Sequence, residues 1–237
     1  MKKVNTIRAY PDFIGIGAQR SGTTWLWRAL SKHSGTALPQ VKELHYFDRD
    51  ITAGGSVLRE TRLVNRYFGL SKASQRSRKK LFRDVAISIR SMSLHNIQWV
   101  ARYYGHVPND GWYLSLFDRP DGLITGDITP SYSLLSVEKI RHIKSLMPDV
   151  RILLIIRDPI ERIWSSFLFG HRRNSYPDST FKPDKLRDAV LRPAGIERGY
   201  YTKVIQRWLS VFPAEQLFIG FYDDIKKDPL AVFRQVL

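Results

Sequence analysis

The 237-residue chain contains no cysteine, which excludes disulfide bonds, thiolate nucleophiles and zinc sites built on cysteine. No window approaches the roughly 18 consecutive apolar residues of a membrane span. The opening residues, MKKVNTIRAYPDF, lack the apolar core of a signal peptide. The six histidines show no H-E-x-x-H or comparable spacing, so we expect no metal site. From these absences we expect a soluble, cytoplasmic protein that works without a metal.

Acidic residues are scarce beside basic ones, 22 against 38, which leaves a formal net charge of +16. Such a balance favours acidic ligands or polyanionic partners. Apolar residues make up 43% of the chain, enough to build the core of an α/β domain. We expect a single domain over residues 1–237.

Short apolar runs alternate with helical patterns along the chain. The strand candidates are residues 13–17, a short piece near 36–38, 123–126, 151–156 and 216–221. The helix candidates are residues 23–33, 91–104, 137–146, 159–170 and 197–212. This alternation predicts an α/β fold, a parallel sheet with helices on both faces. Residues from about 50 to 120 are expected to form a helical insertion.

The segment FIGIGAQRSGTTWL, residues 13–26, reads as a strand, a tight loop and the first turn of a helix. Such a unit directs backbone N–H groups and the positive end of a helix at one small volume, which suits a phosphate. Arg20 adds a permanent charge, and Ser21, Thr23 and Thr24 add hydroxyl groups. The alternative is a strand–helix turn that binds nothing.

This loop resembles a nucleoside-triphosphate P-loop but lacks its lysine. The spacing from Gly17 to Gly22 fits G-x-x-x-x-G, yet Thr23 follows where that motif has Lys. Because this lysine normally reaches the β- and γ-phosphates, its absence argues against a triphosphate. The loop therefore predicts a different anionic nucleotide.

A second anion site is predicted where the apolar run 151–156 ends in Arg157-Asp158-Pro159 and enters a helix. In open α/β sheets, ligands bind beyond the carboxyl ends of the strands, which is where Arg157 lies. Ser165 follows about two helical turns later and can face the same anion. Asp158 can cap the helix. The alternative is a structural charge cluster of Arg157, Asp158 and Arg162.

The segment KELHYFD, residues 42–48, supplies a candidate general base. If it is extended, alternation places Glu43 and His45 on the same side, near the mouth of the first loop. A carboxylate beside a cationic anion site is suited to accept a proton from an incoming nucleophile. The alternatives are an exposed, salt-bridging Glu43 and a structural His45.

Together, these segments resemble a sulfotransferase that uses 3′-phosphoadenosine 5′-phosphosulfate (PAPS), of the heparan-sulfate and bacterial carbohydrate branch. GAQRSGTTWL resembles the family's 5′-phosphosulfate loop, and LLIIRDPIERIWSSF its 3′-phosphate motif. KELHYFD is similar to the segment with the catalytic Glu. The resemblance implies a P-loop NTPase-like fold and transfer of a sulfuryl group to a hydroxyl or amine, possibly on an acidic glycan, with release of adenosine 3′,5′-bisphosphate (PAP).

The resemblance also assigns roles. Glu43 is the implied base, His45 orients it or the acceptor, and Arg20 stabilises the leaving phosphate. The implied donor-binding residues are Gln19, Arg20, Ser21, Gly22, Thr23, Thr24, Arg157 and Ser165. PAPS is then the co-substrate, and neither a metal nor a dedicated nucleic-acid partner is expected.

Three departures and two alternatives accompany this interpretation. Arg20 stands where many family members have Lys, which keeps the charge but not the geometry. Ile128 stands where related enzymes often carry Lys, and the chain ends at Leu237 inside a predicted helix, which suggests that a C-terminal segment is missing. The sequence leaves open a polyanion-binding domain without catalysis and a P-loop kinase or NTPase. It does not identify the acceptor, and Trp99, Trp112 and Tyr46 are aromatic side chains that could face one.

Overall fold

The computed structural model describes residues 10–48, 81–86, 94–118, 122–173 and 193–237, with the single positions 75, 79, 184, 187, 190 and 191. The chain divides into two compact units. One contains residues 11–38, 42–48 and 122–237, and is called here the sheet unit. The other contains residues 1–10, 39–41 and 49–121, and is called the insertion unit. The expected single domain over 1–237 stays a prediction.

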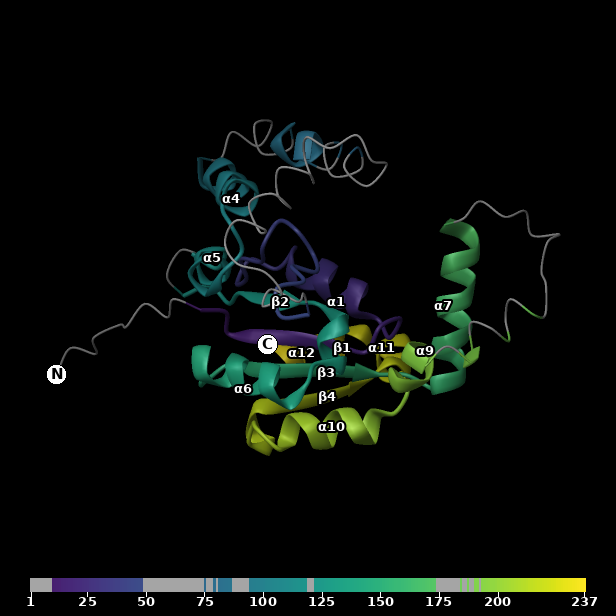
Figure 1. Ribbon diagram of the computed structural model, residues 1–237. Coiled ribbons are helices and arrows are strands. Elements are labelled where there is room, and N and C mark those ends of the chain that lie inside the picture. Colours follow the sequence, from purple (N-terminus) through teal and green to yellow (C-terminus); the bar gives the residue numbers. More distant parts are fainter. Residues whose placement is uncertain are drawn as a thin grey trace. The chain divides into compact units, whose positions relative to one another are not determined.

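A four-stranded sheet forms the centre of the sheet unit (Figure 1). Its strands are β1 (Phe13–Gly17), β2 (Gly126–Ile128), β3 (Arg151–Ile156) and β4 (Leu217–Phe221). They run in the order β2-β1-β3-β4, and each neighbouring pair is parallel. Parallel strands direct their carboxyl ends to one edge, so the segments that follow β1, β2 and β3 meet there.

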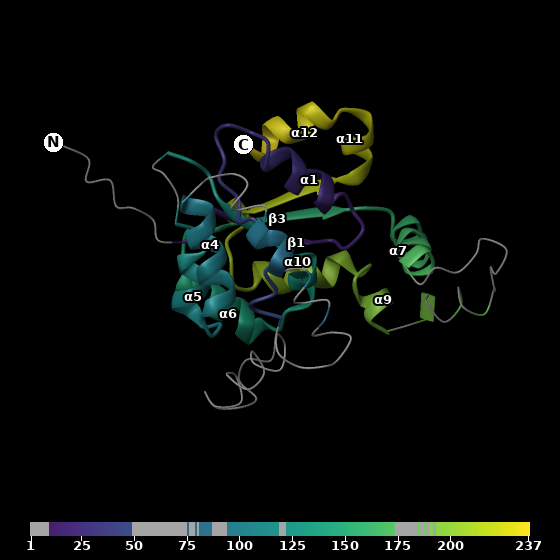
Figure 2. The same ribbon diagram turned by 90° about the horizontal axis from the view of Figure 1, so that it is seen from above.

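Helices cover both faces of this sheet, as the alternation of elements predicts (Figure 2). One face carries α1 (Thr23–Leu30), α11 (Tyr222–Lys227) and α12 (Pro229–Val236). The other carries α6 (Val137–Leu146) and α10 (Tyr201–Leu209). The other elements that the structure describes in this unit are η1 (Pro130–Leu134), α7 (Pro159–Arg173), α9 (Pro193–Glu197) and η3 (Ala214–Gln216).

β1, β3 and α6 have the bounds that the sequence predicts, and the other elements differ by one to several residues at one or both ends. The predicted helix 197–212 is shortened to α10, because Glu197 ends α9 and a turn at Gly199 precedes Tyr201. The predicted strand at 36–38 is reduced to an isolated bridge between Thr36 and Ile124. Strand β2 begins at Gly126 rather than at residue 123, since pairing with β1 starts there.

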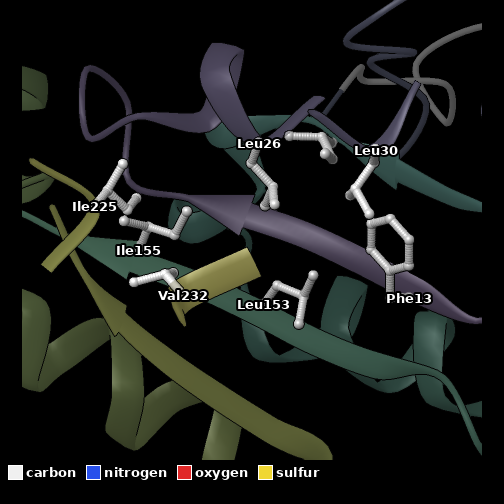
Figure 3. Close-up of a cluster of buried hydrophobic side chains, with 8 residues drawn as sticks. Phe13, Leu26, Leu30, Leu153, Ile155, Ile225 and Val232 are labelled. Atoms are coloured by element: carbon white, nitrogen blue, oxygen red, sulfur yellow. The ribbon is translucent and has the colours of Figure 1, made fainter. Parts of the chain in front are cut away.

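The core below α1 is built from alternate residues of the central strands (Figure 3). Phe13, Leu153 and Ile155 face Leu26 and Leu30 of α1 and the side chains from α11 and α12. Ile14, Ile16, Ile152 and Leu154 alternate with them and are fully buried. A strand buried on both faces reads as a continuous apolar run, which is why β1 and β3 are recognisable in the sequence.

The described part of the insertion unit contains α4 (Leu94–Gly105) and α5 (Asp110–Ser115). The Trp99 ring stacks on Tyr103 at 5.1 Å, and its indole N–H donates to the Leu116 carbonyl. Trp99 and Trp112 are only 2% and 6% exposed, and Tyr46 of the sheet unit only 5%. These three aromatics belong to cores, so the expectation that they face an acceptor is corrected. Among the described residues, no helix is long and apolar enough to cross a membrane.

The core predicts a large effect of truncating Ile155. The side chain is 1% exposed between β3 and the helices above it, so Ile155→Ala leaves a cavity and lowers the free energy of unfolding by about 2–5 kcal/mol. Ile160, which is 79% exposed in the first turn of α7, is the control, and Ile160→Ala changes it by less than about 0.5 kcal/mol. Urea denaturation measures both, and equal effects would contradict this core.

Candidate active site

The loop after β1 is shaped by two residues with left-handed backbone, Arg20 (φ 72°) and Gly22 (φ 90°). A Cβ at Gly22 would lie 3.2 Å from Ile225 Cδ1 and from Tyr222 Cδ2, so both conformation and space favour glycine. Gly22 is the N-cap of α1, and no side chain caps this helix end. The positive end of α1 is therefore left open toward the carboxyl edge of the sheet.

The side chains of the loop complete an anion site at this helix end. Ser21 is fully buried, and its hydroxyl has no hydrogen-bond partner among the described residues. Thr23 is buried as well, while Gln19 and Thr24 are exposed. A buried hydroxyl without a partner is unfavourable, and a bound oxyanion would supply one.

Arg157 follows β3 at the same edge of the sheet. Its Nη1 donates to the Arg20 carbonyl at 3.3 Å, and its guanidinium lies 4.3 Å from the centre of the Tyr222 ring. Nε and Nη2 donate to one oxygen of Glu161, at 3.1 and 2.9 Å. The side chain is 17% exposed. Arg157 is thus held against the first loop, with Glu161 as its counter-charge.

The surroundings of Arg157 settle two sequence-based expectations. The Asp158 carboxylate accepts hydrogen bonds from the backbone N–H groups of Ile160 and Glu161, so it caps α7 as predicted. The alternative cluster of Arg157, Asp158 and Arg162 does not form. Arg157 pairs with Glu161 instead, and Arg162 is buried, where it donates to the Gly195 carbonyl.

Arg20 joins the first loop to α7. Its Nε donates to Ser165 Oγ at 3.3 Å, and its guanidinium lies 4.4 Å from the centre of the Phe169 ring. Burial lowers the pKa of Arg20, and repulsion from Arg157 lowers it further. Two cations that repel each other at one place are best stabilised by an anion between them. The two hydrogen bonds of Arg20, one from its side chain to Ser165 and one from Arg157 to its carbonyl, bring these three residues together.

The segment 42–48 is not extended, which corrects the geometry expected from alternation. Glu43 and His45 both have left-handed backbone, with φ of 63° and 55°. The segment is fixed to η1, because the Tyr46 N–H donates to the buried Tyr132 hydroxyl at 2.9 Å and the Phe47 ring packs edge-on against Tyr132. Glu43 and His45 still face each other, but from an irregular segment with left-handed backbone rather than from a strand.

A line of polar contacts runs through this segment. The Lys42 ammonium donates to Thr24 Oγ1 at 3.1 Å and to Glu43 Oε1 at 2.7 Å. The other oxygen of Glu43 lies 3.5 Å from His45 Nε2. His45 Nδ1 contacts Asp48 Oδ2 at 2.7 Å, and Ser131 donates to the same oxygen at 2.6 Å. The line links the phosphate loop to η1 through a carboxylate and an imidazole.

These contacts set the charges of the line. Hydrogen bonds to Asp48 and then Glu43 raise the pKa of His45 to about 9, so the imidazole is protonated at neutral pH. The hydrogen bond from His45, followed by Lys42, lowers the pKa of Glu43 to about 2 despite its partial burial. Glu43 is therefore an ionised proton acceptor that is held between two cations.

Sequence reasoning missed three members of this line, Lys42, Asp48 and Ser131. Lys42 and Asp48 stand in the segment already singled out, and the i, i+3 spacing from His45 to Asp48 was the available signal. Ser131 lies 83 residues from Asp48, so only the tertiary fold pairs them. Ile128 is 2% exposed within the core, and position 128 therefore contributes no side chain to the site.

Within the described residues, no group of three or more His, Asp or Glu side chains is arranged to hold a metal ion. Arg20, Arg157 and Lys42 have contacts that reach the loop after β1 or the first turn of α1 that follows it.

The fold is that of an α/β protein of the P-loop type, with two guanidinium groups and a paired carboxylate near the end of its first strand. The chain belongs to the sulfotransferase family, whose sequence model matches residues 11–237.

Curated relatives are sulfotransferases of larger size. Human heparan sulfate glucosamine 3-O-sulfotransferase 3B1 is 30% identical over 123 residues, which cover 50% of this chain and 31% of that protein. Carbohydrate sulfotransferase 15 from Rattus norvegicus is 24% identical over 92% of this chain and 41% of its own length. The chain thus spans about a third to two fifths of the length of these relatives.

Two solved structures share the fold. A sulfotransferase from Alicyclobacillus acidocaldarius superposes with a TM-score of 0.60 at 20% identity, over 95% of this chain and 78% of that one. The sulfotransferase domain of the Synechococcus PCC 7002 olefin synthase gives 0.55 at 19% identity, over 95% and 71%. They confirm the predicted P-loop-like α/β architecture.

The contacts of His45 predict an unusually basic imidazole. We expect NMR titration to give a pKa of about 9 for His45, and Asp48→Asn to lower it toward the ordinary 6.5. Because the folded-state pKa is the higher one, the stabilisation is complete below about pH 6.5 and is lost as the pH rises through about 9. Loss of one signal in His45→Gln assigns the resonance, and an ordinary pKa in the unmodified protein would contradict the arrangement.

Proposed function

We propose that this protein transfers the sulfuryl group of PAPS to a hydroxyl or amine of a carbohydrate and releases PAP. The observation that carries the proposal is the convergence of Arg20, Arg157 and Ser165 on the loop after β1, within reach of the Lys42–Glu43 pair. An anion site with two guanidinium groups suits a ligand that carries phosphate at both ends.

The residues present fit such a donor. The open end of α1, the buried Ser21 hydroxyl and the flanking residues Gln19, Gly22, Thr23 and Thr24 are suited to its 5′-phosphosulfate. Arg157 and Ser165 are suited to its 3′-phosphate. The carboxylate of Glu161 already pairs with the guanidinium of Arg157. A phosphate that binds Arg157 therefore has to displace Glu161 or share the guanidinium with it. Donor binding is then an exchange of counter-ions.

The mechanism derives from the charges of the site. PAPS supplies the sulfuryl group: the acceptor atom forms a bond to sulfur as the bond from sulfur to the 5′-phosphate oxygen breaks. Glu43 takes the proton of the acceptor. Arg20 offsets the negative charge that the 5′-phosphate oxygen gains, and donors aimed at developing charge are worth about 3–4 kcal/mol each. His45, held by Asp48 and Ser131, keeps the Glu43 carboxylate in place.

A carbohydrate acceptor is supported by the names of the relatives and by the charge of the chain. The curated relatives include heparan sulfate and carbohydrate sulfotransferases. A formal net charge of +16 favours an acidic glycan over a neutral one through long-range attraction. The cytoplasmic location expected from the sequence stays a prediction.

Binding of PAP tests the donor site. We expect Arg157→Ala to weaken PAP binding by about 10- to 100-fold, because it removes charge-assisted hydrogen bonds from one phosphate. Arg151 is the matched control: it lies exposed at the opposite end of the same strand, and Arg151→Ala leaves the affinity unchanged. Isothermal titration calorimetry measures both. Loss of affinity in both variants alike would indicate general polyanion binding, and turnover of MgATP would indicate a kinase or NTPase.

Transfer of labelled sulfate from PAPS tests the reaction and the base. With heparan sulfate, chondroitin and simple phenols as acceptors, we expect label in the glycans. Glu43→Gln lowers the rate of transfer by about 10²- to 10⁴-fold because the acceptor keeps its proton, while PAP still binds. Glu215→Gln, on η3, is the control. A Glu43→Gln variant with full turnover would remove Glu43 from its role.

A further inference from the structure

Lys42 holds a position that the proposed mechanism does not yet use. Its ammonium joins Thr24, in the first turn of α1, to Glu43, the proposed base. The side chain is 19% exposed, so the contact is sheltered but reachable. A lysine ammonium has three donors, and these two contacts use two of them.

The pairing with Lys42 works against the chemistry of Glu43. A general base is most effective when its pKa lies near the working pH. The pKa of Glu43 is lowered to about 2 by His45 and Lys42. The described groups that face Glu43 are these two, with Asp48 and Ser131 behind His45. Because His45 is held on its far side by Asp48, Lys42 is the partner that can leave.

The donor itself offers Lys42 a competing anion. An oxyanion at the open end of α1 lies beside Thr24, to which the ammonium is already bonded. The flexible stem of lysine and its rotating donors allow the head to turn about this contact. The ammonium of Lys42 then leaves the Glu43 carboxylate and pairs with an oxygen of the bound anion.

We propose that Lys42 is a donor-sensing cation that pairs with Glu43 in the empty site and moves onto the transferring sulfuryl group when PAPS binds. This inference rests on the proposed function and extends it. The move places positive charge on the sulfuryl oxygens and leaves Glu43 a stronger acceptor for the proton. The base is thereby activated only in a loaded site. If Lys42 instead stayed in a fixed salt bridge with Glu43, it would make no contact with the sulfuryl group and would not affect the affinity for PAPS relative to PAP.

A moving Lys42 and a fixed salt bridge are distinguished by the affinities for three nucleotides, PAPS, PAP and adenosine 5′-phosphosulfate (APS), measured without an acceptor. PAP lacks the sulfuryl group, and APS lacks the 3′-phosphate. We expect Lys42→Met to weaken PAPS by about tenfold or more while PAP is unchanged. Arg157→Ala weakens PAPS and PAP but not APS. Lys42→Arg keeps the charge and restores part of the preference for PAPS.

The control is Lys32→Met, an exposed lysine beyond the C-terminal end of α1, which changes none of the three affinities. Circular dichroism checks that each variant is folded. If Lys42→Met does not fold, the affinities of Lys42→Arg for the three nucleotides are used in its place. If PAP and PAPS are weakened alike or not at all by Lys42→Met, the role of Lys42 is overturned while the proposed function stands. If the unmodified protein binds neither, the proposed function fails and this inference with it.

The pH dependence of transfer gives an independent readout. The acid limb of kcat/KM for the donor reports Glu43 in the empty site, and that of kcat reports it in the loaded site. In Lys42→Met we expect the limb of kcat/KM to move to higher pH, because Glu43 has lost a cation, while the limb of kcat does not move. Equal movement of both limbs would mean that Lys42 stays on Glu43 throughout the reaction.

Discussion

The meeting of Arg20 and Arg157 at the carboxyl edge of the sheet is the constraint on which the candidate site depends. Arg20 and Arg157 come from segments 137 residues apart, yet a hydrogen bond joins the side chain of one to the backbone of the other. Their proximity is imposed by the sheet, because β1 and β3 are neighbours and both end at the same edge. Glu161 balances part of the charge. In the proposed function, the phosphates of the donor offset the remaining positive charge.

Strained backbone marks the same place. Among the described residues, left-handed conformation outside glycine occurs at Arg20, Glu43 and His45, each at an estimated cost of about 1–3 kcal/mol. The surrounding contacts hold these conformations: Arg157 on the Arg20 carbonyl, and Tyr132 on the chain after His45. The strain orients the three side chains that the proposed reaction needs most. The strained backbone therefore lowers the free energy of unfolding at the residues that are proposed to carry the reaction.

The phosphate loop and the acid–base line are coupled through one side chain. Lys42 contacts both Thr24 and Glu43, so in the proposed switch a donor bound in the loop changes the charge beside the carboxylate. At the other end, Asp48 and Ser131 hold His45 against η1, which follows β2. Loading of the donor site and readiness of the base are therefore linked by charge. This link suits an enzyme that must protect a reactive donor from water.

The sequence by itself determined the apolar strands β1 and β3 and predicted the residues of the two proposed phosphate sites. The strands buried on both faces are continuous apolar runs, and Arg157 necessarily follows the run 151–156, so its place at the sheet edge could be predicted. The tertiary structure alone decided the partners. Local patterning suggested an extended segment 42–48. The segment is irregular instead, with left-handed backbone at Glu43 and His45. It is held by contacts with Ser131 and Tyr132 of η1, which lie over 80 residues away. The hydrogen bond of Lys42 to Thr24, 18 residues away, and the contact of Arg157 with the Arg20 carbonyl, 137 residues away, depend on side-chain directions that the sequence does not encode.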